Sequence, residues 1–171
     1  MKKFIKEVLP YIVIIIIVLL IKKFLFSPIR VIGPSMNHTL LNGDIMILDK
    51  ISYRFNDIER FDIVVIKTNK TKIIKRVIGL PGDKIEYKDN KLYINGEYVK
   101  EDFLDKNTKT YDFTLYDLTG YETIPEGYYF VMGDNREESS DSRIIGLISK
   151  KNIEGHAKYT IFPFRRFGSK K

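Results

Sequence analysis

The chain has 171 residues, which is enough for one domain with a hydrophobic core and a short additional segment. Its net charge of +7 comes from 29 Lys and Arg against 22 Asp and Glu, but the excess of basic residues lies beside an N-terminal hydrophobic segment and at the end of the chain. The middle, from Phe24 to Phe164, is nearly neutral. We therefore expect no nucleic acid partner, because a nucleic-acid-binding protein usually carries its basic patch on the folded domain, and basic ends suit an anionic lipid surface better.

The sequence contains no cysteine and two histidines. The absence of cysteine excludes a disulfide scaffold, a thiolate nucleophile and any metal site with cysteine ligands. His38 and His156 stand alone and give no metal-ligand spacing, so we interpret each as a surface or packing residue.

The N-terminal segment is strongly apolar. Residues Val8 to Ile21 form an uncharged run of 14 with lysines on both sides. Lysine stems can extend toward the membrane surface, so we expect residues 1–26 to be an anchor whose helix, from about Phe4 to Phe26, crosses the bilayer once. A cleaved signal peptide is the alternative, but the bulky residues that follow Ile21 contain no Ala-x-Ala-like site. Charge counting gives only a small bias toward a cytoplasmic N-terminus, because lysines flank both ends.

The remainder of the chain has the pattern of a β-protein. Short apolar or alternating runs lie between polar turns, and Asn95-Gly96 is a strong signal for a two-residue hairpin. The strands that we expect are 45–48, 63–66, 73–79, 84–87, 91–94, 97–99, 128–132 and 157–162. No convincing helical period occurs outside the anchor.

The predicted fold class is therefore mainly β: one N-terminal transmembrane helix and a compact, coiled-sheet or barrel-like domain at 27–171. Residues 100–126 are polar and weakly patterned, which indicates an excursion from the main sheet. With the hairpin strands before it, this excursion forms a small insertion at about 84–126, which we call the cap.

Ser35 lies in the segment Gly-Pro-Ser-Met-Asn-His-Thr-Leu at 33–40. Glycine and proline restrict the backbone and can present a side chain at a bend. Taken alone, the segment fits an ordinary turn serine better than a nucleophile.

Lys75 occurs within an expected strand that is otherwise apolar. It shares one face of that strand with Ile73 and Val77, while Arg76 lies on the other face. Two interpretations stay open: a charged residue that protects an edge strand, or a desolvated amine. Desolvation lowers the pKa of a lysine and allows it to act as a base near neutral pH.

A third segment, 133–143, is polar and contains three serines, two of them beside Asp141. An ordinary loop is one interpretation. In the other, the Ser139 hydroxyl orients the Lys75 amine, and Asp141 forms a bidentate pair with Arg143 that fixes the loop.

In their order and content the three segments closely resemble the bacterial type I signal peptidases, peptidase family S26. The matching patterns are Gly-x-Ser-Met-x-x-Thr-Leu, Lys-Arg-x-x-Gly-Leu-Pro-Gly-Asp and Gly-Asp-Asn-Arg followed after five residues by Ser-Arg. The resemblance runs from the anchor to about Gly146.

The resemblance implies a serine endopeptidase that removes signal peptides from exported precursor proteins, cutting after Ala-x-Ala-type sites. Ser35 would be the nucleophile and Lys75 the general base. Ser139 would orient the lysine, while Asp141 and Arg143 would support the site. It also implies a single-pass protein of the cytoplasmic membrane with an extracytoplasmic catalytic domain and no metal or cofactor. We expect a monomer.

Two positions depart from the family pattern. His38 stands where the family usually has proline, and Gly33 stands where some members have a serine whose hydroxyl binds the oxyanion. The Ser35 backbone N–H is then the expected oxyanion donor, and the second donor is not identified.

Two other functions compete with a signal peptidase. A self-cleaving bacterial repressor shares the Ser-Lys chemistry, but it needs a DNA-binding segment where this chain has an apolar one. A membrane-attached β-domain that binds exported proteins without cutting them would not require Ser35 and Lys75.

Overall fold

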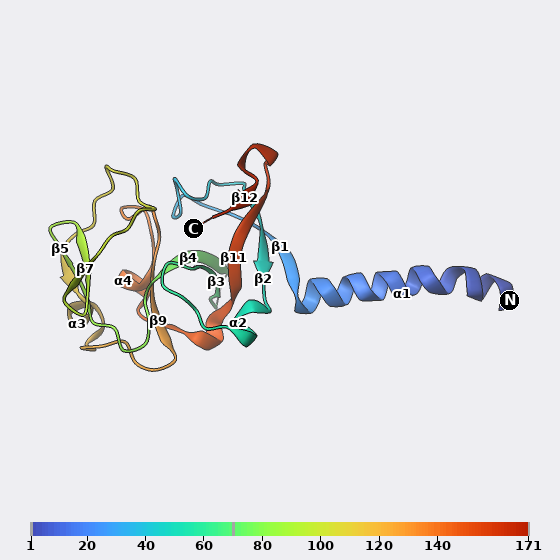
Figure 1. The fold of residues 1–171 in the computed structure, drawn as a ribbon, viewed down its shortest axis with the longest axis horizontal. Coiled ribbons are helices and arrows are strands. Elements are labelled where there is room, and N and C mark those ends of the chain that lie inside the picture. The colour runs from blue at the N-terminus through green and yellow to red at the C-terminus, as the bar shows by residue number, and fades with distance from the viewer. Residues whose placement is uncertain (1, 70, 171) are drawn as a thin grey trace.

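The computed structural model describes residues 2–69 and 71–170, with side chains from Lys6 onward. It consists of a long N-terminal helix and a β-rich body (Figure 1). The strands of the cap lie at the end of the body farthest from that helix.

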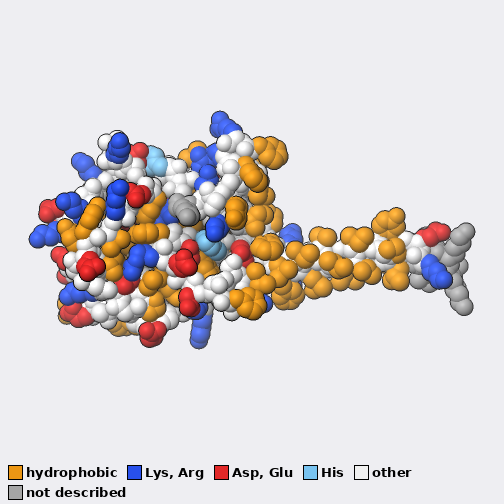
Figure 2. Space-filling model, in the orientation of Figure 1, with side chains coloured by type: hydrophobic (Ala, Val, Ile, Leu, Met, Phe, Trp, Pro, Cys, Tyr) orange, Lys and Arg blue, Asp and Glu red, His pale blue; other side chains and the backbone are white. Residues whose placement is uncertain are grey.

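Helix α1 (Lys2–Phe24) projects from the body and exposes apolar side chains on all sides (Figure 2). Lys50 fixes its C-terminal end, because its Nζ donates to the carbonyls of Lys22 and Lys23 at 3.2 Å each. The predicted extension to Phe26 is wrong: the helix ends at Phe24, and Phe26 opens the first strand by pairing with Asp49. Over the described ranges, no helix combines the length and the apolarity that a bilayer crossing requires, so the predicted transmembrane helix is not confirmed.

The main sheet is antiparallel and contains eight of the strands that the structure describes. Its order is β1 (Phe26–Arg30), β2 (Ile45–Asp49), β11 (Ile153–Phe162), β3 (Ile63–Lys67), β4 (Lys72–Gly79), β9 (Tyr128–Met132) and β10 (Ile148–Ser149), with β12 (Gly168–Ser169) paired to β11. The register shifts at three places along β11 and once between β4 and β9. Such irregularities increase local twist, and the sheet curls.

The cap contains a separate four-stranded sheet. Its order is β7 (Glu97–Val99), β6 (Lys91–Ile94), β5 (Ile85–Lys88) and β8 (Phe113–Thr114), followed by the short helix α3 (Leu115–Thr119). Asn95 and Gly96 both have positive φ, 52° and 85°, as the tight turn between β6 and β7 requires. The expected hairpin is confirmed.

The expected strands are all present. Three of them, 91–94, 97–99 and 128–132, have the predicted bounds, the bounds of four others are shifted by one residue, and β11 begins four residues earlier than predicted. The structure adds very short helices that the sequence analysis did not predict, because segments of three to five residues show no helical period: α2 (Ser52–Phe55), α3, α4 (Ser142–Ile145), and the 3₁₀ turns η1 (Lys150–Asn152) and η2 (Phe164–Arg166). Local caps hold two of them. Thr114 and Asp117 form a capping box at α3, and the Asp141 side chain accepts the Arg143 N–H at α4.

One hydrophobic cluster joins the cap to the main sheet. Ile85 and Tyr87 from the cap and Phe130 and Met132 from β9 are all buried within it. Burying each such side chain contributes roughly 1.5–3 kcal/mol, so the cap is part of the packed core of the domain. This packing brings the interior of the cap beside the loop that follows β9.

Candidate active site

Ser35 lies on the loop between β1 and β2, and this loop is packed against the hydrophobic core. Met36 and Leu40, which follow Ser35 in this loop, are 1% and 0% exposed. Two backbone hydrogen bonds close the turn, from Asn37 N to the Pro34 carbonyl and from Leu40 N to the Met36 carbonyl, both 2.8 Å. The bend therefore presents Ser35 at the edge of a fixed structure.

Lys75 lies in the middle of β4 and is 3% exposed. Its Nζ is 2.7 Å from Ser35 Oγ, so the two residues separated by forty positions are in hydrogen-bond contact. Burial lowers the pKa of the amine from its ordinary value of 10.5. The charges of Asp141 and Asp134 oppose that change and the charge of Arg143 reinforces it, but burial dominates. Of the two interpretations of Lys75, the structure matches the desolvated amine.

The loop after β9 meets both partners. Pairing between β4 and β9 ends at Arg76 and Met132, so Gly133 comes next to Lys75. A Cβ on Gly133 would collide with both Ser139 Oγ and the Ser35 carbonyl oxygen, and only glycine permits this close approach. Asn135 completes the contact, because its N–H donates to the Ser35 carbonyl at 3.1 Å.

Asp141 and Arg143 form a bidentate pair. Arg143 donates from Nε and Nη2 to the two carboxylate oxygens at 2.9 and 2.8 Å, and the Gly133 N–H donates to Asp141 at 3.0 Å. Complete burial of Asp141 acts to raise its pKa, but these hydrogen bonds and the Arg143 charge outweigh burial and lower the pKa. Asp141 therefore remains a carboxylate and ties the start of α4 to Gly133.

Ser139 lies beside this group without joining Lys75. It is buried and contributes to the low pKa of Asp141, yet its Oγ does not meet hydrogen-bond geometry with any group in the described part of the chain. The predicted contact between Ser139 and the Lys75 amine is not formed in this structure.

A second buried pair, Arg76 with Asp134, has no counterpart among the predicted site residues. Arg76 is fully buried and donates from Nε and Nη2 to Asp134 at 2.8 and 2.6 Å. It also donates to the Phe61 carbonyl at 2.9 Å, and its guanidinium lies 3.9 Å from the ring centroid of Phe103 in the cap. Arg76 lies in the motif of Lys75, and Asp134 lies in the Gly-Asp-Asn-Arg motif. The sequence signal for this pair was that Lys75 and Arg76 put a charged side chain on each face of an otherwise apolar strand.

Within the described ranges, neither histidine forms a hydrogen bond or ion pair with Ser35 or Lys75. His38 is exposed and has a φ of 78°, which a proline ring cannot adopt. His156 stacks on Tyr53 with ring centroids 5.6 Å apart and lies 3.6 Å from Asp62. Burial lowers the pKa of His156 even though Asp62 opposes the change.

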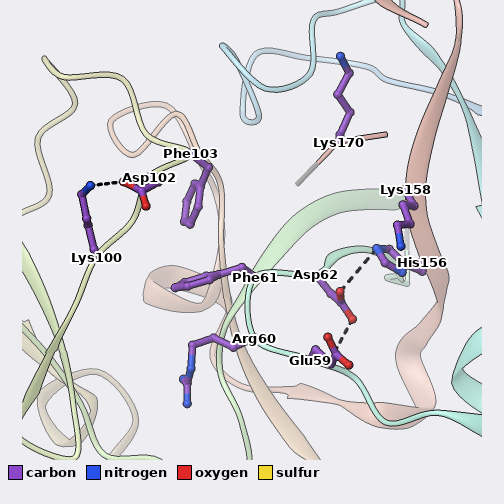
Figure 3. Close-up of a pocket in the computed structure, with 10 residues that line it drawn as sticks. All are labelled: Glu59, Arg60, Phe61, Asp62, Lys100, Asp102, Phe103, His156, Lys158 and Lys170. Atoms are coloured by element: carbon purple, nitrogen blue, oxygen red, sulfur yellow. Dashed lines mark hydrogen bonds and ion pairs between the residues drawn. The ribbon is translucent and has the colours of Figure 1, made fainter. Parts of the chain in front are cut away.

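Two of the cavities lined by described residues lie between the cap and the body. One, of about 560 Å³, opens between Phe103 of the cap and Phe61, Asp62 and His156 of the body, and neither Ser35 nor Lys75 lines it (Figure 3). The other, of about 510 Å³, lies between cap residues 111–118 and the loop after β9, with Ser139 in its wall. The second cavity therefore adjoins the candidate site.

The matching family model is described as signal peptidase, peptidase S26, and it covers residues 2–162. The chain belongs to this family. Curated relatives cover most of it: a signal peptidase I V of Bacillus subtilis (strain 168) is 46% identical over 84% of this chain and 90% of the relative. A signal peptidase I of Bacillus caldolyticus is 42% identical over 92% and 91%.

A solved structure gives the same result at the level of the fold. The crystal structure of a signal peptidase I from Enterococcus faecalis V583 is 42% identical and superposes with a TM-score of 0.54. The match covers 59% of this chain and 97% of that chain. The mainly β body of this S26 family member is thus shared with a solved signal peptidase I.

The close approach at Gly133 gives a first prediction. Gly133→Ala should destabilise the protein by about 1–3 kcal/mol, because the backbone of the Ser35 turn or the buried Ser139 must move. Gly79→Ala is the matched control. Its Cβ meets chiefly the terminal methyl groups of Ile85 and Ile124, which can shift. Thermal unfolding of both variants in detergent measures the difference, and equal melting temperatures would contradict the prediction.

Proposed function

We propose that the chain is a membrane-bound serine endopeptidase that removes N-terminal signal peptides from exported proteins, with Ser35 as nucleophile and Lys75 as general base. The observation that carries the proposal is the 2.7 Å contact between Lys75 Nζ and Ser35 Oγ, with the amine almost fully buried. The S26 family match supports the reaction class. We also propose that residues 1–26 are the anchor, 27–171 the catalytic domain and 84–126 its cap.

The reaction begins with a neutral Lys75, whose Nζ takes the proton of Ser35 Oγ as the oxygen attacks the carbonyl carbon of the scissile bond. The peptide C–N bond then breaks, and the Lys75 ammonium gives its proton to the departing amine. This leaves an ester between Ser35 and the signal peptide. Lys75 next takes a proton from water, the hydroxide attacks the ester carbon, and the proton returns to Ser35 Oγ as the signal peptide leaves.

The negative charge on the tetrahedral intermediate needs hydrogen-bond donors. The Ser35 backbone N–H has no acceptor within the described ranges, so it is available to the oxyanion. Gly33 provides no hydroxyl at the position where some family members have a serine. We therefore assign the first donor to Ser35 N–H.

Three side chains support the pair in this proposal. Asp141 and Arg143 hold the backbone at Gly133, which limits movement of Ser35. Ser139 lies against Gly133, and its buried, unbonded hydroxyl supports its proposed role in orienting the Lys75 amine. The proposed substrate is a precursor with small residues at the first and third positions before the scissile bond, the specificity that the family resemblance implies. The relatives named signal peptidase support the substrate class.

Helix α1 gives the proposed attachment to the membrane. Its 14-residue uncharged run spans about 21 Å at ~1.5 Å per residue, and it projects from the body with apolar side chains on every side. Lys22 and Lys23 follow this run where the helix meets the body. We propose that the body lies on the extracytoplasmic side of the cytoplasmic membrane and that the enzyme works as a monomer.

The catalytic pair is tested by cleavage of a precursor with an Ala-x-Ala site in detergent. Ser35→Ala and Lys75→Ala should each lower kcat by about 10³-fold or more, because either change removes a group that acts only with the other. His38→Ala with His156→Ala is the control and should retain most of the activity. A wild type that binds the precursor without cutting it would favour the binding domain, and cleavage by Ser35→Ala would exclude this nucleophile.

The low pKa of Lys75 predicts the dependence on pH. Because the amine must be neutral to accept a proton, kcat/KM should rise as pH increases through the lowered pKa and then level off. Asp141→Asn removes a charge that raises this pKa and should move the rising limb to lower pH, while Arg143→Gln should move it to higher pH. Initial rates from pH 5 to about 10 measure both changes. A flat profile, or shifts in the same direction, would contradict the lysine base.

The absence of cysteine allows a clean test of orientation. Lys6→Cys marks the start of α1 and Glu97→Cys marks the exposed edge of the cap. In intact cells an extracellular, membrane-impermeant maleimide should label the cap variant and not the Lys6→Cys variant, while both react after lysis. Labelling of Lys6→Cys alone in intact cells would reverse the orientation, and extraction of the protein by high salt without detergent would reject the anchor.

A further inference from the structure

Arg136 joins the cap to the loop after β9. It is 3% exposed, and three of its partners come from the cap. Nη1 donates to Tyr87 Oη at 2.7 Å and to Thr110 Oγ1 at 3.1 Å, while Nη2 donates to Glu101 at 2.5 Å. The side chain thus extends from the loop after β9 into the interior of the cap.

The cap residues form a receptor for this guanidinium. Tyr87 Oη donates to the same Glu101 carboxylate at 2.8 Å, and the Tyr87 ring centroid is 5.4 Å from the Arg136 guanidinium carbon. Tyr87 is 1% exposed. A buried charge is costly unless it is paired and its hydrogen bonds are satisfied, and here every nitrogen of Arg136 has an acceptor.

The other contacts of Arg136 lead to the site. Its Nε donates to the Gly133 carbonyl at 3.1 Å, and its own carbonyl accepts Arg143 Nη2 at 2.7 Å. Gly133 is the residue wedged against the Ser35 carbonyl and Ser139. Arg143 is the partner of Asp141. The guanidinium and the carbonyl of Arg136 therefore connect the cap to Gly133 and to Arg143, the two residues that fix the loop after β9.

A second contact between cap and body involves Arg76, the residue after Lys75 in β4. Phe103 of the cap packs on Phe61 with ring centroids 5.1 Å apart, and the Arg76 guanidinium lies over the Phe103 ring (Figure 3 shows the two phenylalanines). Phe61 holds a φ of 72°, which is unusual for a bulky residue. The cap thus contacts the neighbour of Lys75 in sequence as well as the loop beside it.

We propose that Arg136 is a positioning residue through which the cap sets the distance between Ser35 and Lys75. The cap residues Tyr87, Glu101 and Thr110 hold the guanidinium, the guanidinium fixes Gly133 and Arg143, and these hold the Ser35 turn against Lys75. The inference rests on the proposed peptidase function and adds a role for the cap in it. Small errors in the placement of reacting groups cost large factors in rate, so a loosened loop lowers turnover before it unfolds the domain.

The first part of the test changes the cap and leaves the loop after β9 intact. Tyr87→Phe removes one acceptor of Arg136, and Glu101→Gln removes the negative charge that pairs with it, each with little change of shape. Tyr98→Phe and Glu97→Gln are the matched controls, because these residues are exposed on β7, an edge strand of the sheet that contains Tyr87. Wild type and the four variants are assayed as full-length proteins in detergent for kcat, KM, pH profile and melting temperature.

Tyr87→Phe and Glu101→Gln, the receptor variants, should each lower kcat by about tenfold or more. KM should stay within about twofold, because the substrate still binds while Ser35 and Lys75 are misplaced. Their rising pH limb should move upward, because looser packing admits water to Lys75 between Asp141, Asp134 and Arg143. The controls should match the wild type. Arg136→Lys should recover part of the rate lost in Arg136→Ala, because lysine keeps the positive charge. The recovery should be incomplete, because lysine lacks the five donors of the guanidinium.

Three results would overturn the inference: unchanged kcat and pH limb in folded receptor variants, equal losses in receptor and control variants, or a lower melting temperature with unchanged turnover at a temperature where all remain folded. The wild type separates this inference from the proposed function. If the wild type does not cleave, the proposed function fails and this role fails with it. If it cleaves and the receptor variants cleave equally well, only the role of Arg136 is rejected.

Discussion

The contact between the Lys75 amine and the Ser35 hydroxyl imposes a condition on everything around it. An amine can lose its charge near neutral pH only if it is kept from water. A hydroxyl can lie 2.7 Å from it only if the two segments, forty residues apart in sequence, are held rigidly in place. The sheet satisfies the first condition by placing Lys75 in the middle of β4. The second requires the loop after β9, because Ser35 lies on a connection between strands and not within the sheet.

Charge pairs hold that loop. Three arginine–carboxylate pairs lie in it or against it: Arg76 with Asp134, Arg136 with Glu101, and Arg143 with Asp141. Buried pairs often add little net stability, because desolvation of both ions offsets their attraction. Their bidentate geometry does restrict direction, however, and removal of one partner leaves a buried charge. We therefore interpret these pairs as devices that fix positions rather than as the source of the stability of the domain.

The alternation of residues along the strands was sufficient to predict most of the fold. The apolar residues around Lys75 predicted a strand, and Asn95-Gly96 predicted the hairpin between β6 and β7 in the cap sheet. Arg136 could not be assigned a role in this way. Its partners come from positions 49, 35 and 26 residues away, and only packing of the cap against β9 brings them together. A long charged side chain in a polar loop carries no periodic signal, so tertiary contacts alone distinguish it from a solvent-exposed arginine.

The departure at His38 shows the same dependence on tertiary contacts. Proline would fix φ near −65°, which restrains a turn locally, whereas His38 has a φ of 78° and brings no such restraint. The restraint on the Ser35 turn therefore comes from elsewhere. Leu40 is buried beneath it, Asn135 donates to its carbonyl from the loop after β9, and Arg166 donates to the Thr39 carbonyl at 2.9 Å from the C-terminal segment. Since these contacts come from separate parts of the chain, the position of the serine depends on the folded domain as a whole, and the cap contributes to it through the same loop.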